Sequence, residues 1–168
     1  RGLEYVLGAR ERTDSLVRDV VLEDARPFTP LCVKRAGGEE TQLFVKEVIA
    51  DRRRYIVCRN EAEAAKDAAD RAAVIAALDQ QLKRGDKALI GNSAYRRYLR
   101  PTAKHAFEID PGKVADEARF DGIFVLRTNP SAGHSTGCRR RNLQASSARI
   151  TPLQAVLRYR DLIQVEAL

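Results

Sequence analysis

The sequence predicts an α/β fold with an inserted β-rich section, and three runs of residues lead to this prediction. Residues 3–9 have the composition of a strand and are followed by apolar residues at helical spacing. Residues 61–84 carry the clearest helical pattern in the chain. Residues 123–129 are largely apolar, as is typical of a central strand, and runs rich in β-forming residues precede the long helix.

The first third of the chain is predicted as strand, helix, loop and hairpin, in that order. Prolines and glycines between residues 27 and 38 mark the loop. Residues 43–49 and 54–58 then form a predicted β-hairpin. Three arginines lie at its turn, and they fit both contact with phosphate and a solvated, charged hairpin tip: Arg52, Arg53 and Arg54.

The helix at residues 61–84 has both of its ends marked in the sequence. Asn60 is a preferred N-cap residue, and Gly85 is the glycine expected just beyond a helix C-terminus. Lys83 and Arg84 suit the negative end of the helix dipole. Its apolar positions are typical of a helix that packs against a core.

Two tyrosines enclose two arginines in the segment that follows this helix. Tyr95, Arg96, Arg97 and Tyr98 fit contact with a nucleic-acid strand through charge and base stacking. The commoner arrangement for such a run is a packed tyrosine pair flanked by solvated arginines. A short strand at 107–110, a short helix at 111–119 and an Asp-Gly turn then lead into the apolar run.

The last helix is predicted from Thr151 to Leu168. Thr151 and Gln154 form the pattern of a capping box, and a proline occupies the first helical position between them. Helical spacing places Tyr159 and Glu166 on one side of this helix. A carboxylate there is either a residue at the rim of the packed face or one that is paired or bound to metal.

Composition narrows the class of protein. Hydrophobic residues make up 44% and charged residues 32% of the chain, which is typical of a soluble globular protein. No apolar run approaches the ~18 residues of a membrane span, and no secretory signal opens the chain, so we expect a cytoplasmic location. The chain contains no Met and begins at Arg1, so we expect it to be an internal fragment.

Cysteine and histidine give no sign of a metal site. Cys32, Cys58 and Cys138 are widely spaced, and His105 and His134 form no ligand motif.

The net charge of +7 indicates a polyanion, such as DNA or RNA, as a binding partner. This charge is local, because residues 130–160 contain no acid and six arginines: Arg139, Arg140, Arg141, Arg149, Arg158 and Arg160.

Several blocks carry a resemblance when they are taken together. They are YVLGAR at residues 5–10, VKEV at 45–48, RYIVCRNE at 54–61, KDAADR at 66–71, LKRGDK at 82–87, GN at 91–92, YRRYL at 95–99, FDG at 120–122, VLRTN at 125–129 and the helix from Tyr159 to Glu166. The chain resembles the middle of bacterial DDE transposases of the insertion-sequence-four type.

The resemblance implies a partial ribonuclease H-like core. Residues 1–25 and 120–168 would belong to this core, and residues 26–119 would be the inserted β-rich and helical section. In this family a catalytic Glu follows a Tyr by seven positions on the last helix, which here matches Tyr159 and Glu166. Leu162 stands where the family has Arg, and the family's Lys position falls beyond residue 168.

The same resemblance implies an enzyme that cleaves DNA and transfers strands with Mg²⁺ or Mn²⁺. Glu166 is the candidate third carboxylate and metal ligand, and the two catalytic Asp are expected upstream of Arg1. Because carboxylates must hold two ions together, we expect this segment alone to be inactive and to bind no metal tightly. The expected partner is DNA, at the element ends and at the target, with a homodimer in the parent protein.

Residues 130–150 depart from the family, which has a short connection there. The segment is rich in Ser, Gly and Arg, and three interpretations remain: a DNA-contacting loop, a family variation, or the scar of a frameshift. The candidate DNA-binding residues are Tyr159, Arg139, Arg140, Arg141, Arg96, Arg97, Arg158 and Arg160. The alternative function is a catalytically dead transposase remnant that acts only as a nucleic-acid-binding or structural module.

Overall fold

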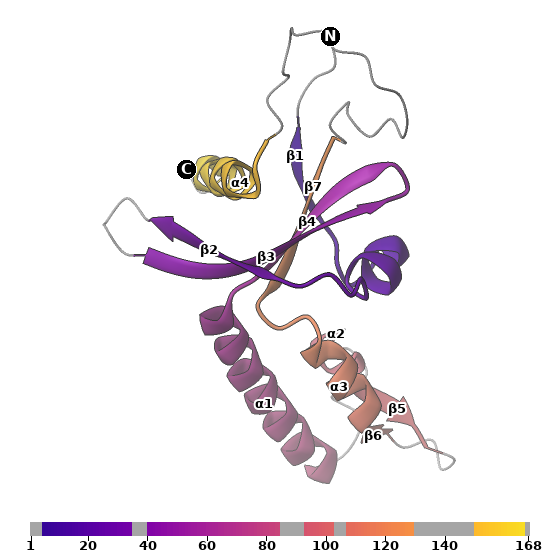
Figure 1. The fold of residues 1–168 in the computed structure, drawn as a ribbon. Helices are drawn as coiled ribbons and strands as arrows, with labels where there is room; N and C mark the ends of the chain where they lie inside the picture. Colours follow the sequence, from indigo (N-terminus) through magenta and orange to yellow (C-terminus); the bar gives the residue numbers. More distant parts are fainter. Residues whose placement is uncertain (1–4, 35–39, 85–92, 103–106, 130–149, 167–168) are drawn as a thin grey trace, which may run out of the picture. The chain divides into compact units, whose positions relative to one another are not determined.

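The computed structural model describes residues 5–34, 40–84, 93–102, 107–129 and 150–166, and for residues 93 and 161–166 it describes the backbone alone. The chain folds into two compact units. One contains Arg1–Arg59 with Phe124–Leu168, and the other contains Asn60–Ile123. Both helices and strands are present, so the predicted mixture of helix and sheet is confirmed (Figure 1).

The first unit is built on a five-stranded sheet in the order β1-β7-β4-β3-β2 (Figure 1). Strand β1 pairs antiparallel with β7, β2 with β3, and β3 with β4. The apolar run predicted as a central strand is β7, which lies between β1 and β4. The strands are β1 (Val6–Ala9), β2 (Thr29–Lys34), β3 (Glu40–Ala50), β4 (Arg53–Arg59) and β7 (Ile123–Thr128).

Helix α4 (Pro152–Glu166) covers one face of this sheet (Figure 1). Its Ala155 and Val156 are buried against side chains that alternate along the strands, as period-two geometry requires. The sheet residues of this core are Val6, Val33, Leu43, Val45, Ile56, Cys58 and Leu126. The core therefore lies between the last helix and strands that are distant from it in sequence.

The short helix η1 (Val17–Val21) packs against β3. Val17 and Val21 are buried, whereas Val20 is 51% exposed, so only part of the apolar spacing in this stretch serves the core. Lys46 of β3 donates hydrogen bonds to the carbonyls of Leu22 and Asp24, at 3.0 and 2.6 Å. Burial lowers the pKa of this Lys46 ammonium.

The predicted β-hairpin is confirmed, with Ala50 paired to Arg53 across a two-residue turn. Both turn residues have positive φ, 47° at Asp51 and 57° at Arg52, which is the backbone of a type I′ turn. The placement of three arginines at the tip was wrong for one of them. Arg54 is 2% exposed, because it points to the same side of β4 as the core residue Ile56.

Relieving this turn should stabilise the protein. We expect Arg52→Gly to raise the free energy of unfolding by about 0.5–1 kcal/mol, because glycine adopts positive φ without steric cost. Urea denaturation of both proteins measures the change. As a control, Arg53→Gly alters a paired strand residue and should lower stability. A lower midpoint in Arg52→Gly would contradict the assigned turn.

The second unit consists of α1 (Glu61–Arg84), α2 (Ser93–Arg96), the strand pair β5 (Leu99–Pro101) and β6 (Phe107–Ile109), and α3 (Pro111–Ala118). The long helix has the predicted bounds. Its apolar side packs through buried Leu78 against Tyr98 and Leu99. The short strand and the short helix predicted after it are confirmed as β6 and α3.

A hydrogen-bonded junction lies at the start of α1 within this unit. The Asn60 amide donates to the Gly122 carbonyl at 2.9 Å, and the Gly122 amide donates to Asp67 Oδ2 at 2.8 Å. Asp121 forms an ion pair with Arg71, which raises the pKa of the Arg71 guanidinium. Gly122 has a φ of +62°, so the predicted Asp-Gly turn is a glycine-dependent turn.

One sequence prediction, the loop between residues 27 and 38, was partly wrong, and another, the ribonuclease H-like core, is not tested by the structure. The loop predicted between residues 27 and 38 was wrong for residues 29–34, which form the edge strand β2, because an edge strand tolerates a proline such as Pro30. The ribonuclease H-like core, with sections 1–25, 26–119 and 120–168, stays a prediction.

Within the described ranges, no helix combines the length and apolar character that a membrane span requires.

The two cysteines that the structure describes differ sharply in environment. Cys32 is exposed, whereas Cys58 is buried and burial raises the pKa of its thiol to about 12. In a Cys138→Ser background at pH 8, we expect a thiol reagent to label Cys32 at least about tenfold faster than Cys58, because Cys58 is buried away from the reagent and its raised pKa disfavours the reactive thiolate. Mass spectrometry of the labelled peptides gives the two rates. In urea, where the chain is unfolded, the two cysteines should be labelled at equal rates. Equal rates in the folded protein would contradict the buried position of Cys58.

Candidate functional site

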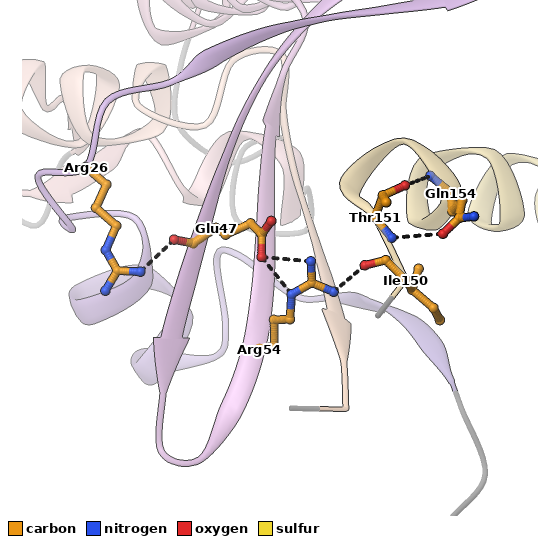
Figure 2. Close-up of polar contacts among 6 residues, drawn as sticks. All are labelled: Arg26, Glu47, Arg54, Ile150, Thr151 and Gln154. Carbon is orange, nitrogen blue, oxygen red and sulfur yellow. Dashed lines mark hydrogen bonds and ion pairs between the residues drawn. The ribbon is translucent and has the colours of Figure 1, made fainter. Parts of the chain in front are cut away.

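The start of helix α4 is fixed by the capping box that the sequence predicts. The backbone amide of Gln154 donates to Thr151 Oγ1 at 3.2 Å, and the backbone amide of Thr151 donates to Gln154 Oε1 at 2.9 Å (Figure 2). These two bonds satisfy amides that a helix N-terminus leaves without partners in the helix. The candidate catalytic helix therefore begins at a defined residue.

A buried arginine from the hairpin meets this helix start. Arg54 Nε and Nη2 both lie 2.7 Å from Glu47 Oε2, and Arg54 Nη1 donates to the Ile150 carbonyl at 2.7 Å (Figure 2). Glu47 is held in turn through its backbone, since Arg26 Nη1 donates to the Glu47 carbonyl at 2.8 Å. Strands β3 and β4 thus hold the residue that precedes the helix cap.

Tyr159 lies in the middle of α4 and is partly buried against the sheet core. A Cβ atom built at Gly8 of β1 would lie 2.6 Å from the Tyr159 hydroxyl oxygen and 3.2 Å from its ring. The first strand and the last helix therefore approach closely at this glycine. The proposal that Tyr159 contacts DNA stays a prediction, and its packing gives the side chain a structural role as well.

Glu166 is the last residue of α4 in the structure. The side chain of this candidate catalytic residue and metal ligand lies outside the described residues, so its role stays a prediction. The arginines 139, 140 and 141 also lie outside the described residues.

The described arginines among the DNA-binding candidates fall into different surroundings. On α4, Arg158 is exposed, and Arg160 Nη1 donates to the Lys34 carbonyl of β2 at 3.2 Å. Arg96 and Arg97 belong to the other unit and are exposed. Arg97 lies 3.5 Å from Glu117.

The tyrosines beside Arg96 and Arg97 are packed. Tyr98 is 5% exposed, and Tyr95 packs against the same cluster. The structure therefore confirms the packed tyrosine pair, flanked by exposed arginines, as the arrangement in this run.

Two described aspartates that precede the apolar strand β7 in the sequence, Asp110 and Asp121, have structural partners. Asp110 Oδ1 caps α3 by accepting from the amides of Gly112 and Lys113, at 2.9 and 3.4 Å. Asp121 is paired with Arg71. In the part of the chain that the structure describes, no group of three His, Cys, Asp or Glu residues is placed to share a metal ion.

Sequence reasoning missed the contact between Arg54 and the helix start. The signal was present in the period of two along β4, because Arg54, Ile56 and Cys58 share the face that carries the core. A charged residue at such a position requires a partner when it is buried. The three consecutive arginines concealed this alternation.

Comparison with known proteins adds no relative to these observations. No protein-family model, no curated protein and no solved structure matches the chain.

Proposed function

We propose that this chain is part of a DDE transposase of the insertion-sequence-four type, with a ribonuclease H-like core, and that the parent enzyme cleaves DNA and transfers strands. Glu166 is the third metal-binding carboxylate in this proposal. The observation that carries it is the close approach of Tyr159 to Gly8, because the two residues belong to blocks that resemble the same family and lie at opposite ends of the chain.

A second contact between resembling blocks supports the proposal. The Tyr5 amide donates to Asn129 Oδ1 at 3.0 Å, so the block at residues 5–10 is bonded to the block at 125–129. Strands β1 and β7 continue this pairing up to Ala9 and Val125. We expect blocks that belong to one core to pack together in this way.

The junction in the second unit supports the proposal in the same manner. It joins the resembling blocks around Asn60, Asp67 and Gly122 through two backbone amides. These residues therefore have a structural explanation that needs no catalytic role. Among the described residues, the proposal therefore assigns the chemistry to the last helix and not to this junction.

Glu166 supplies one carboxylate, and the two Asp expected upstream would supply the others. Mg²⁺ or Mn²⁺ held by such a set stabilises the attacking and leaving oxygens during displacement at phosphorus. Asp110 and Asp121 do not substitute for the missing pair, since one caps a helix and the other pairs with Arg71. DNA is the partner in this proposal, and exposed Arg158 is one candidate contact to its phosphates.

The metal requirement gives a prediction for the chain alone. We expect calorimetric titration with Mg²⁺ or Mn²⁺ to show no tight stoichiometric binding, because one carboxylate does not hold a divalent ion against water. Tight binding that disappears in Glu166→Gln would contradict this expectation and would assign a complete site to the chain.

The activity is tested on the protein encoded by the complete gene. Plasmid DNA that carries the element ends should be cleaved with Mg²⁺, and Glu166→Gln should abolish cleavage. Glu63→Gln is the matched control, because Glu63 is an exposed carboxylate on α1 that pairs only loosely with Lys66, at 3.8 Å. If Glu166→Gln retains full activity, Glu166 is not the third carboxylate and that assignment fails. If no Asp pair lies upstream and the protein does not cleave DNA, the proposal fails and a DNA-binding or structural remnant replaces it.

A further inference from the structure

We propose that Arg54 is the positioning residue of the C-terminal helix: through one guanidinium it ties the residue before the α4 cap to the β3–β4 hairpin, and so sets the register of α4 on the sheet. The role assigned to Glu166 rests on the proposed function. The anchoring of the helix by Arg54 rests on contacts within the described residues alone.

The geometry of the guanidinium makes this connection directional. Its Nε and Nη2 engage Glu47, and this pairing aims the remaining nitrogen, Nη1, at the Ile150 carbonyl (Figure 2). Arginine presents its donors in a planar, rigid fork, so fixing one edge fixes the direction of the other. Arg54 is 2% exposed, which leaves its head group little freedom to reorient.

The charge of Glu47 is required for Arg54 to occupy this position. The N-terminus of a helix carries a partial positive charge, so a cation beside it is unfavourable unless an anion accompanies it. Glu47 Oε2, at 2.7 Å from two guanidinium nitrogens, is that anion. The pair therefore approaches the helix start as a nearly neutral unit that still offers a hydrogen-bond donor.

Anchoring the helix start has consequences along its whole length. An α-helix turns about 100° per residue, so a slip of one position would rotate Tyr159 away from Gly8 and would turn Glu166 to a different direction. The capping box fixes where the helix begins, and Arg54 fixes where that beginning lies on the sheet. Together, the capping box and Arg54 set the orientation of α4 on the sheet, and so the position of its last residues.

The test measures hydrogen exchange of individual backbone amides in the full chain by NMR. The helix is monitored at Ala155 and Val156, and the sheet at Val45 and Val57. In Arg54→Met, we expect exchange in the helix to accelerate at least about tenfold more than in the sheet, because the helix opens locally. Arg54→Lys should behave alike, since one ammonium group does not reproduce the fork.

Controls separate positioning from a general loss of stability. Arg53→Met removes the neighbouring, exposed arginine, which points to the opposite side of β4 from Arg54, and it should change helix and sheet exchange by less than about twofold. Thr151→Ala is the positive control, because it weakens the cap while Arg54 stays in place. If Arg54→Met does not fold, Glu47→Gln serves as the second variant and should also loosen the helix selectively.

Two results would overturn the proposal: equal acceleration in helix and sheet, or no acceleration in the helix. Neither depends on metal or DNA, so a parent protein that fails to cleave DNA would refute the proposed function and leave the anchoring intact. In an active parent enzyme, Arg54→Met should lower the cleavage rate at saturating DNA at least about tenfold, with unchanged affinity for DNA. A change in DNA affinity alone would contradict a positioning role.

Discussion

Replacing Gly122 with alanine is expected to lower the free energy of unfolding by about 3–5 kcal/mol, the largest loss that we predict for a single methyl group in this protein. Two costs add at this position. The φ of +62° is unfavourable for any residue with a Cβ atom, and the added atom has no room.

The space at Gly122 is limited by backbone atoms of the α1 start. A Cβ there would lie 2.2 Å from the Asn60 carbonyl oxygen and 2.7 Å from the Ala64 amide nitrogen. These atoms are held by the helix itself, because the Ala64 amide donates to that same Asn60 carbonyl at 2.9 Å. Relief of the clash would therefore require the helix to begin differently, and overpacking of this kind is costly.

Gly112→Ala is the matched control for Gly122→Ala. Gly112 lies in the first turn of α3, and its nearest obstacle is Asp110 Oδ1, at 3.2 Å from a built Cβ. A side-chain oxygen moves more easily than a helix backbone, so the two variants should differ by more than about 2 kcal/mol in urea denaturation. Equal losses in both variants would show that the turn at Gly122 is not fixed as described.

Local signals explain which elements the sequence could predict. The bounds of α1 and the start of α4 depend on capping residues, and the hairpin depends on two β-forming runs around a short turn. Strand β2 was missed because Pro30 indicates a loop unless the position at the sheet edge is known. Edge position depends on strand order, which no local pattern contains.

The candidate site divides in the same way. Helical periodicity placed Tyr159 and Glu166 on one side of a helix, but it could not identify the strand that this side meets. The contact with Gly8 and the ion pair of Arg54 join residues that are far apart in sequence. Charge was also a poor guide to surface, since Arg54 is buried beside arginines that are exposed.

The contact of Tyr159 with Gly8 leads to a second large effect, which reverses sign between two backgrounds. We expect Gly8→Val to lower the free energy of unfolding by about 1–3 kcal/mol, because its branched side chain must occupy the space of the Tyr159 hydroxyl and ring. In a Tyr159→Ala background, the same change should be neutral or stabilising. Valine is favoured in strands, and glycine there is entropically costly.

A double-mutant cycle measured by urea denaturation gives the coupling free energy, which we expect to be about 2 kcal/mol. Leu7→Val is the control, because Leu7 is the neighbouring residue of β1, is 47% exposed and points to the opposite side of the strand. Its effect should be the same in both backgrounds. Coupling below about 0.5 kcal/mol at Gly8 would mean that the last helix does not pack on β1 through Tyr159, and the observation that carries the proposed function would be lost with it.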